Sequence, residues 1–138
     1  MSSVANSRGP ILPVRLAHAL SQITEGVPNP WDESDDYFTP FYVPFDDTTT
    51  VNAETLRSAL KVGKRYRLDI AEPNLIEVAD NWGDGGADYR LLDAILKATL
   101  TELMIVRARG DGVVRVRTWL LGRFKGWLVG LKTTSTET

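Results

Sequence analysis

The alternation of apolar and polar residues is clearest in the last third of the chain. It predicts strands over Met104–Arg109, Val113–Leu121 and a segment that starts at Trp127. Glycines around Asp111 mark a hairpin turn between the first two strands, and Gly122–Gly126 marks a turn before the third. The pattern therefore predicts a C-terminal three-strand meander. In its middle strand, Val114, Val116, Thr118 and Leu120 share one face, and Arg115, Arg117 and Trp119 share the other.

A 3.6-residue apolar period predicts two longer helices and a short one. The first helix runs from about Val14 to a stop at Gly26, and a short helix over Ala53–Leu60 is expected to end at Gly63. The third helix is capped by Asp88 and runs to about Leu103. The apolar faces contain Leu16, Ala19, Leu20 and Ile23 in the first helix, and Leu92, Ile95, Leu96, Leu100 and Leu103 in the third.

The middle of the chain adds two strands and two loops. Phe38–Phe45 is aromatic and β-branched but contains two prolines, which predicts a strand near a sheet edge. Tyr66–Ile70 alternates and predicts another strand, whereas Leu75–Ala79 fits either a strand or a helical turn. The acidic stretch 27–36 and the Gly-rich stretch 80–88 are loops.

Composition limits the class of protein. A chain of 138 residues, 43% hydrophobic and 25% charged, predicts one globular domain over 11–138 behind a loose arm at 1–10. It contains no apolar run that could span a membrane and no secretory signal, so we expect a cytoplasmic protein without a membrane partner. The absence of Cys and the single His18 exclude thiolate chemistry and multi-His metal sites.

Charge is sorted along the chain. Between Arg15 and Arg57 there is no Lys or Arg, whereas acidic residues recur throughout that stretch. From Met104 to Lys132 the balance is reversed, and Asp111 is the only acidic residue in that stretch. Two interpretations follow: the acidic side faces a basic partner, or the basic strands neighbour the acidic loop within the fold.

No catalytic motif stands out. The sequence contains no nucleophile elbow, phosphate loop, dinucleotide fingerprint or HExxH. The pattern identifies no set of aromatic residues between the arginines of the basic strands on which bases could stack. Direct nucleic-acid binding is therefore not expected. An enzyme would need a carboxylate pair, and the spacing selects none, so we expect no catalysis. The candidates for such a pair are Asp32, Glu33, Asp35, Asp36, Asp80 and Asp84.

The polar tail Thr133–Thr138 has two interpretations. It directly follows the alternating apolar set of the last strand, which would hold it in place beside the sheet. A held tail would present an α-carboxylate next to a Thr hydroxyl and the Glu137 side chain, a compact set of oxygen atoms. The alternative is an ordinary solvated end.

The arrangement resembles the nuclease A inhibitor family of bacterial proteins. The matching pieces are the helix that ends in Leu20–Gly26, the acidic loop Asp32–Asp35 before an aromatic strand, and Asp80–Trp82 before the Leu-rich helix. The closing hairpin and the terminal Glu137–Thr138 complete the match, which covers roughly residues 16–43 and 80–138.

The resemblance implies an α+β fold, a single-domain α/β/α sandwich with a mainly antiparallel sheet. It also implies an inhibitor that plugs the active site of a sugar-nonspecific, magnesium-dependent endonuclease in a 1:1 complex. The implied contacts are Glu33, for whose role Asp32 competes, and Trp82 together with Asp80. The third implied contact is Thr138, which would reach the partner's metal ion. The full predicted contact set is Asp32, Glu33, Asp35, Asp80, Trp82, Glu137 and Thr138.

We expect no cofactor and no metal site of the protein's own, and a monomer when it is free. The alternative hypothesis is an interaction module of the same fold with an unrelated partner.

Overall fold

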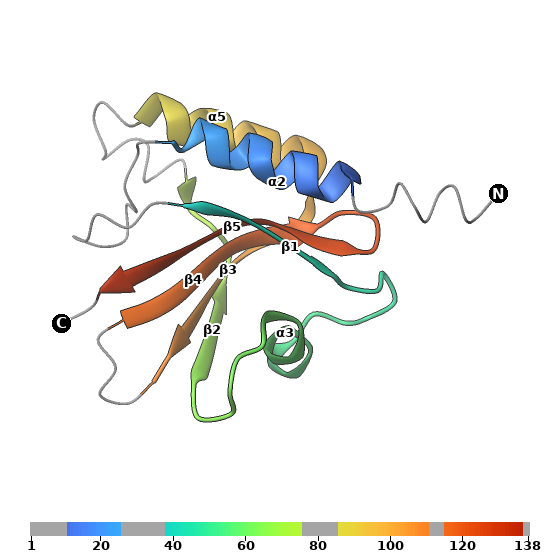
Figure 1. Ribbon diagram of the computed structural model, residues 1–138, viewed down its shortest axis with the longest axis vertical. Coiled ribbons are helices and arrows are strands. Elements are labelled where there is room, and N and C mark those ends of the chain that lie inside the picture. Colours follow the sequence, from blue (N-terminus) through green and yellow to red (C-terminus); the bar gives the residue numbers. More distant parts are fainter. Residues whose placement is uncertain (1–10, 26–37, 76–85, 111–114, 137–138) are drawn as a thin grey trace.

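A five-stranded antiparallel sheet forms the centre of the protein (Figure 1). The computed structural model describes residues 11–25, 38–75, 86–110 and 115–136. The strand order is β1-β5-β4-β3-β2, so the predicted meander β3-β4-β5 is confirmed and β1 and β2 flank it. The strands are β1 (Thr39–Pro44), β2 (Arg67–Ala71), β3 (Thr101–Arg109), β4 (Arg115–Arg123) and β5 (Trp127–Thr136).

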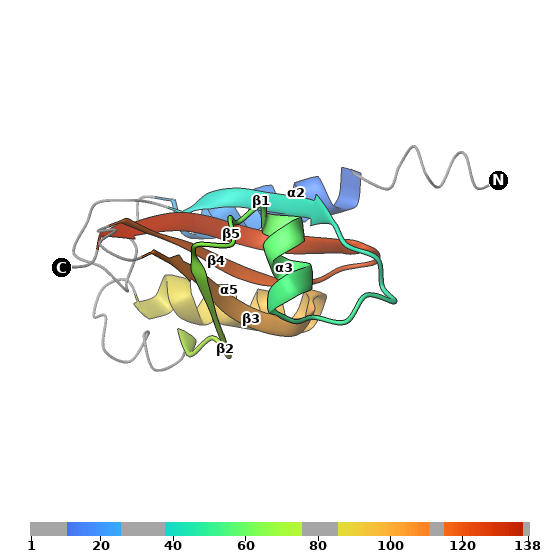
Figure 2. The same cartoon turned by 90° about the horizontal axis from the view of Figure 1, so that it is seen from below.

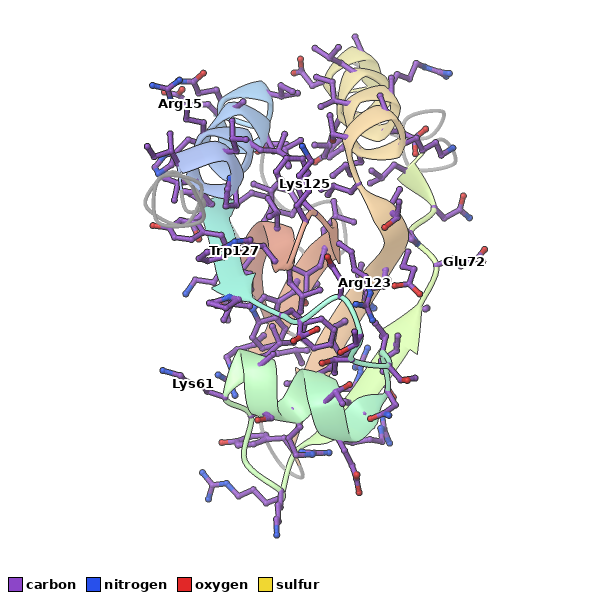
Figure 3. All side chains as sticks on the ribbon, turned by 90° about the vertical axis from the view of Figure 1, so that its right-hand side faces the viewer. Arg15, Lys61, Glu72, Arg123, Lys125 and Trp127 are labelled. Carbon is purple, nitrogen blue, oxygen red and sulfur yellow. The ribbon has the colours of Figure 1, made fainter. Side chains whose placement is uncertain are left out.

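Helices cover both faces of the sheet, which confirms the predicted α+β sandwich. The helices α2 (Ile11–Ile23) and α5 (Gly86–Thr99) lie side by side on one face, and α3 (Ala53–Leu60) lies on the other, as the edge-on view in Figure 3 shows. Each face buries its own apolar cluster. None of the described helices is long and apolar enough to cross a membrane.

The predicted bounds of α5 need correction. The helix begins at Gly86, so Asp88 lies in its first turn and is not its N-cap. It ends at Thr99, and Leu103 belongs to β3 although it continues the helical spacing. Inside β3, Glu102 has a left-handed backbone (φ 50°), and the β3–β4 register shifts between Thr101 and Met104.

The other two helices also differ from prediction at single positions. The α2 helix begins three residues earlier than expected, and it buries Ala17 while Ala19 is exposed. The α3 helix spans the predicted residues and has a capping box between Asn52 and Thr55. Its C-cap is Lys61 in the left-handed region (φ 57°), so Gly63 does not end it.

The second hairpin turn is tighter than predicted. Gly122 lies inside β4, where a side chain would come within 2.6 Å of the Leu100 Cβ atom, so this glycine permits close packing and is not part of a turn. The turn is Lys125-Gly126, with φ of 46° and 84°, closed by two backbone hydrogen bonds between Phe124 and Trp127. A two-residue turn with both φ positive matches the twist of a hairpin.

The strand β5 holds the tail through Thr136. It pairs with β1 on one side and with β4 on the other, and its residues 133–136 pair with Thr118–Arg115. The solvated-end interpretation is therefore wrong for residues 133–136, whereas 137–138 lie outside the described residues. Leu128, Val129 and Leu131 are completely buried, the first on the α3 face and the other two on the opposite face.

Replacing Gly130 tests how tightly β5 is held. A Cβ atom at Gly130 would lie 1.9 Å from the Leu120 carbonyl oxygen, a backbone atom that cannot turn aside. We expect Gly130→Ala to lower the free energy of unfolding by at least about 3 kcal/mol, measured by denaturant titration. Gly63→Ala is the control, because its Cβ atom would meet nothing closer than 3.6 Å. Equal stability of the two variants would contradict this packing.

Part of the acidic stretch contacts a basic residue of the sheet within the fold. Arg123 of β4 lies against the connection between β1 and α3 (Figure 3) and donates to the carbonyl oxygens of Asp46 at 3.2 Å and Asp47 at 3.3 Å. Arg123 also forms an ion pair with Glu102, and the Asp47 carboxylate accepts from the Gly126 N–H at 2.8 Å. For these residues, the intramolecular interpretation holds.

The Asp46 carboxylate makes the stability of this connection depend on pH. Hydrogen bonds from the Thr48 N–H and hydroxyl, with a smaller effect of Arg123, hold the pKa of Asp46 below its ordinary value of 3.8. A lowered folded-state pKa means that the stabilisation is present above about pH 4 and is lost as the pH falls through the folded-state value. We expect Asp46→Asn to lower the thermal midpoint at about pH 7 and the difference to shrink towards about pH 3. A difference that persists at the lower pH would contradict a charge effect.

Candidate functional site

All seven predicted contact residues lie outside the described residues. This holds for Asp32, Glu33 and Asp35, for Asp80 and Trp82, and for Glu137 and Thr138. It also holds for Asp36 and Asp84, the remaining carboxylates considered for catalysis. The described structure does, however, give the positions of the residues that flank these segments.

The flanking elements meet at one end of the sandwich. Figure 1 shows that β1 and α5 begin, and β5 ends, at the same end of the molecule, where α2 also ends. Phe38, which precedes β1, is buried, as are Leu75 before the Gly-rich segment and Tyr89 in the first turn of α5. All three belong to the apolar cluster beneath α2 and α5. One core therefore anchors the flanks of both long segments.

Tyr89 is an anchor of the apolar cluster at this end. Its side chain is fully buried, and burial, with a smaller effect of the Asp88 charge, raises its pKa well above the ordinary value of 10.0. Burial disfavours the phenolate, so the hydroxyl stays protonated at neutral pH. The residue contributes packing to this end of the protein.

Three of the predicted contacts are close in sequence to a described residue. Asp35 is three residues before Phe38, Trp82 is four residues before Gly86, and Glu137 follows Thr136 directly.

A polar row crosses the sheet near this end, on the face that carries α2 and α5. The register aligns Asp69, Arg107, Thr118 and Thr133 across four strands. Asp69 accepts from Arg109 at 2.8 Å and from Arg67 at 3.1 Å. The hydroxyls of Thr118 and Thr133 are buried without a hydrogen-bond partner. Part of this row is visible in the sequence, because both threonines interrupt an apolar alternation.

A hollow of about 460 Å³ between β2, α5 and β3 is lined by three carboxylates, Glu72, Asp93 and Glu102. Asp93 is paired with Lys97 at 3.0 Å, and Glu102 is paired with Arg123. Within the described ranges, no group of three or more His, Cys, Asp and Glu side chains is arranged to hold a metal ion. Two of the three carboxylates at this hollow are therefore paired with a cation.

No known protein-family model matches this chain, and no curated protein matches it either. The resemblance to nuclease inhibitors therefore depends on the sequence motifs, and the geometry described above is independent of it.

The unpartnered threonines give a direct test of the polar row. Thr118→Val keeps the shape of a residue that is 1% exposed and removes its buried hydroxyl, which has no hydrogen-bond partner. We expect the free energy of unfolding to rise by about 1 kcal/mol, because an unsatisfied polar group no longer has to be desolvated. Thr39→Val is the control, since its exposed hydroxyl donates to the Lys132 carbonyl oxygen. A loss of stability in Thr118→Val would contradict the absence of a partner.

Proposed function

We propose that the protein inhibits a sugar-nonspecific, metal-dependent endonuclease by occupying its active site in a 1:1 complex. The observation that carries this proposal is the convergence of three flanks, at the start of β1, the start of α5 and the end of β5, on one end of the sandwich. The predicted contacts Glu33, Trp82 and Thr138 adjoin these flanks in the sequence. A single partner surface can meet all three segments only if they share an end.

The rigidity of this end also supports the proposal. Two flanks are fixed in one buried cluster by Phe38, Leu75 and Tyr89, and β5 is paired through Thr136. Binding loops on a rigid scaffold lose less conformational entropy when a partner is bound. A plug with three points of contact benefits from this, because each segment starts from a fixed position.

The chemistry of the predicted contacts suits a nuclease active site. Such a site holds a hard divalent cation and basic groups that bind phosphate, and carboxylates can take the places of phosphate oxygens. The α-carboxylate and hydroxyl of Thr138 would approach the metal, and Glu33, with Asp32 and Asp35, would meet the basic groups. Trp82 would supply a buried aromatic anchor.

We expect stoichiometric inhibition in a plasmid-cleavage assay. A sugar-nonspecific endonuclease with Mg²⁺ is titrated with the intact protein and with variants that lack Thr138 or carry Trp82→Ala. The intact protein should abolish cleavage at equimolar concentration, and each variant should weaken binding by at least about tenfold, as expected for an interfacial hot spot.

Glu54→Gln is the matched control, because Glu54 is an exposed carboxylate on α3, outside the predicted contact segments. Its inhibition should equal that of the intact protein. If the intact protein fails to inhibit or to bind such nucleases, the alternative of an interaction module with an unrelated partner is favoured. Equal weakening by Glu54→Gln would contradict a contact confined to the predicted segments.

A further inference from the structure

A pocket of about 260 Å³ lies on the face of the sheet that carries α3. The α3 helix has only eight residues and leaves the sheet without a helix over it towards the end of β5 (Figure 2). The pocket is formed where the helix stops, with Leu60 at its edge and Phe41 and Trp119 from the sheet. Because α3 is too short to cover this part of the sheet, a pocket with apolar and aromatic walls is left beside its end.

The charge at this pocket is entirely positive among its lining residues. Arg117 and Lys132 line it together with three threonines, and no carboxylate does. Both cations are exposed, and neither forms an ion pair within the described residues. Lys132 is directly opposite Trp119 in the register, and Arg117 is two residues from Trp119 on the same face, so the two cations are diagonal neighbours.

Aromatic rings hold Arg117 in position. Its guanidinium carbon lies 5.4 Å from the centre of the Trp119 ring and 5.8 Å from that of Tyr66. Tyr66 also contacts the guanidinium of Arg65 at 5.0 Å. Cation–π contacts of this kind restrict the arginine without neutralising it, so its N–H groups remain available for an anion.

Trp119 carries a further unused donor. Its indole N–H is buried and has no hydrogen-bond acceptor in the structure. Buried Trp N–H groups usually have a partner. Trp119 itself lines the pocket. Its proximity to a positively charged pocket makes it a reporter of occupancy.

We propose that this pocket binds a small aryl phosphomonoester. Two diagonal cations match a dianionic phosphate, which accepts several charge-assisted hydrogen bonds, better than they match a monoanion. The walls formed by Phe41, Leu60 and Trp119 suit a flat ring. The volume is below the ~300–1,000 Å³ of drug-sized sites, which limits the ligand to about one ring and one anionic group. The inference does not depend on the proposed nuclease inhibition.

The test is a titration of the intact chain with phenyl phosphate, followed by the four indole N–H signals in ¹⁵N-correlated NMR and by calorimetry. Trp119→Phe assigns its signal. We expect a saturable shift of the Trp119 signal, and we expect phenol, inorganic phosphate and benzoate each to bind at least about tenfold more weakly. Arg117→Gln and Lys132→Gln should each weaken binding by about tenfold to a hundredfold.

Lys125→Gln is the matched control. Lys125 is an exposed lysine that also contacts an aromatic ring, at 5.5 Å from Phe124, but it lies in the β4–β5 turn and does not line the pocket. Lys125→Gln should bind phenyl phosphate as tightly as the intact protein does. The proposal is overturned if phenyl phosphate causes no saturable shift, if benzoate binds more tightly, or if Lys125→Gln weakens binding as much as Arg117→Gln. Thermal unfolding of each variant checks that the exposed substitutions leave the fold intact.

Discussion

The pairing of β5 between β1 and β4 is the constraint on which the rest of the structure depends. Without it, β1 would have no neighbour in the sheet, because β1 pairs only with β5 among the described strands. The approach of the two backbones at Gly130 leaves no room for a side chain. The start of β1 is thereby brought next to β5, where Thr39 pairs with Lys132, although 93 residues separate the two in sequence.

The same pairing relates the two sites to one another. Along β5, Val129 and Leu131 are buried beneath α2 and α5, and Thr133 continues their face as a polar residue. Lys132 lies on the other face, at the pocket near α3. Residues next to each other in one strand thus serve different surfaces, because successive side chains in a strand point to opposite sides.

Much of the fold could be predicted from periodicity. The meander, the edge strand β1 and the short α3 helix all follow from local pattern, since each depends on alternation or capping within a few residues. The ends of elements were less accessible: Asp88 and Gly63 were given capping roles that the structure does not support. Lys61 and Glu102 adopt left-handed backbones that no local residue preference indicates.

The sites were predictable to different degrees. The contact residues of the proposed inhibitor came from family motifs, and they lie outside the described residues. The pocket could not have been found from sequence, because Phe41, Leu60 and Trp119 come from separate elements that only the register and α3 bring together. Arg117 was assigned to a strand face correctly, but its contact with Tyr66 required the position of β2.

The prolines of β1 have a consequence for how the molecule meets its own copies. Proline cannot donate a backbone hydrogen bond, so Pro40 and Pro44 cannot use an N–H either towards β5 or towards the open side of the sheet. Because Pro40, Tyr42 and Pro44 alternate along the edge strand, Tyr42 is the one member of this set with an N–H to offer. An incoming strand would find too few donors to extend the sheet there, and this edge is protected against open-ended association.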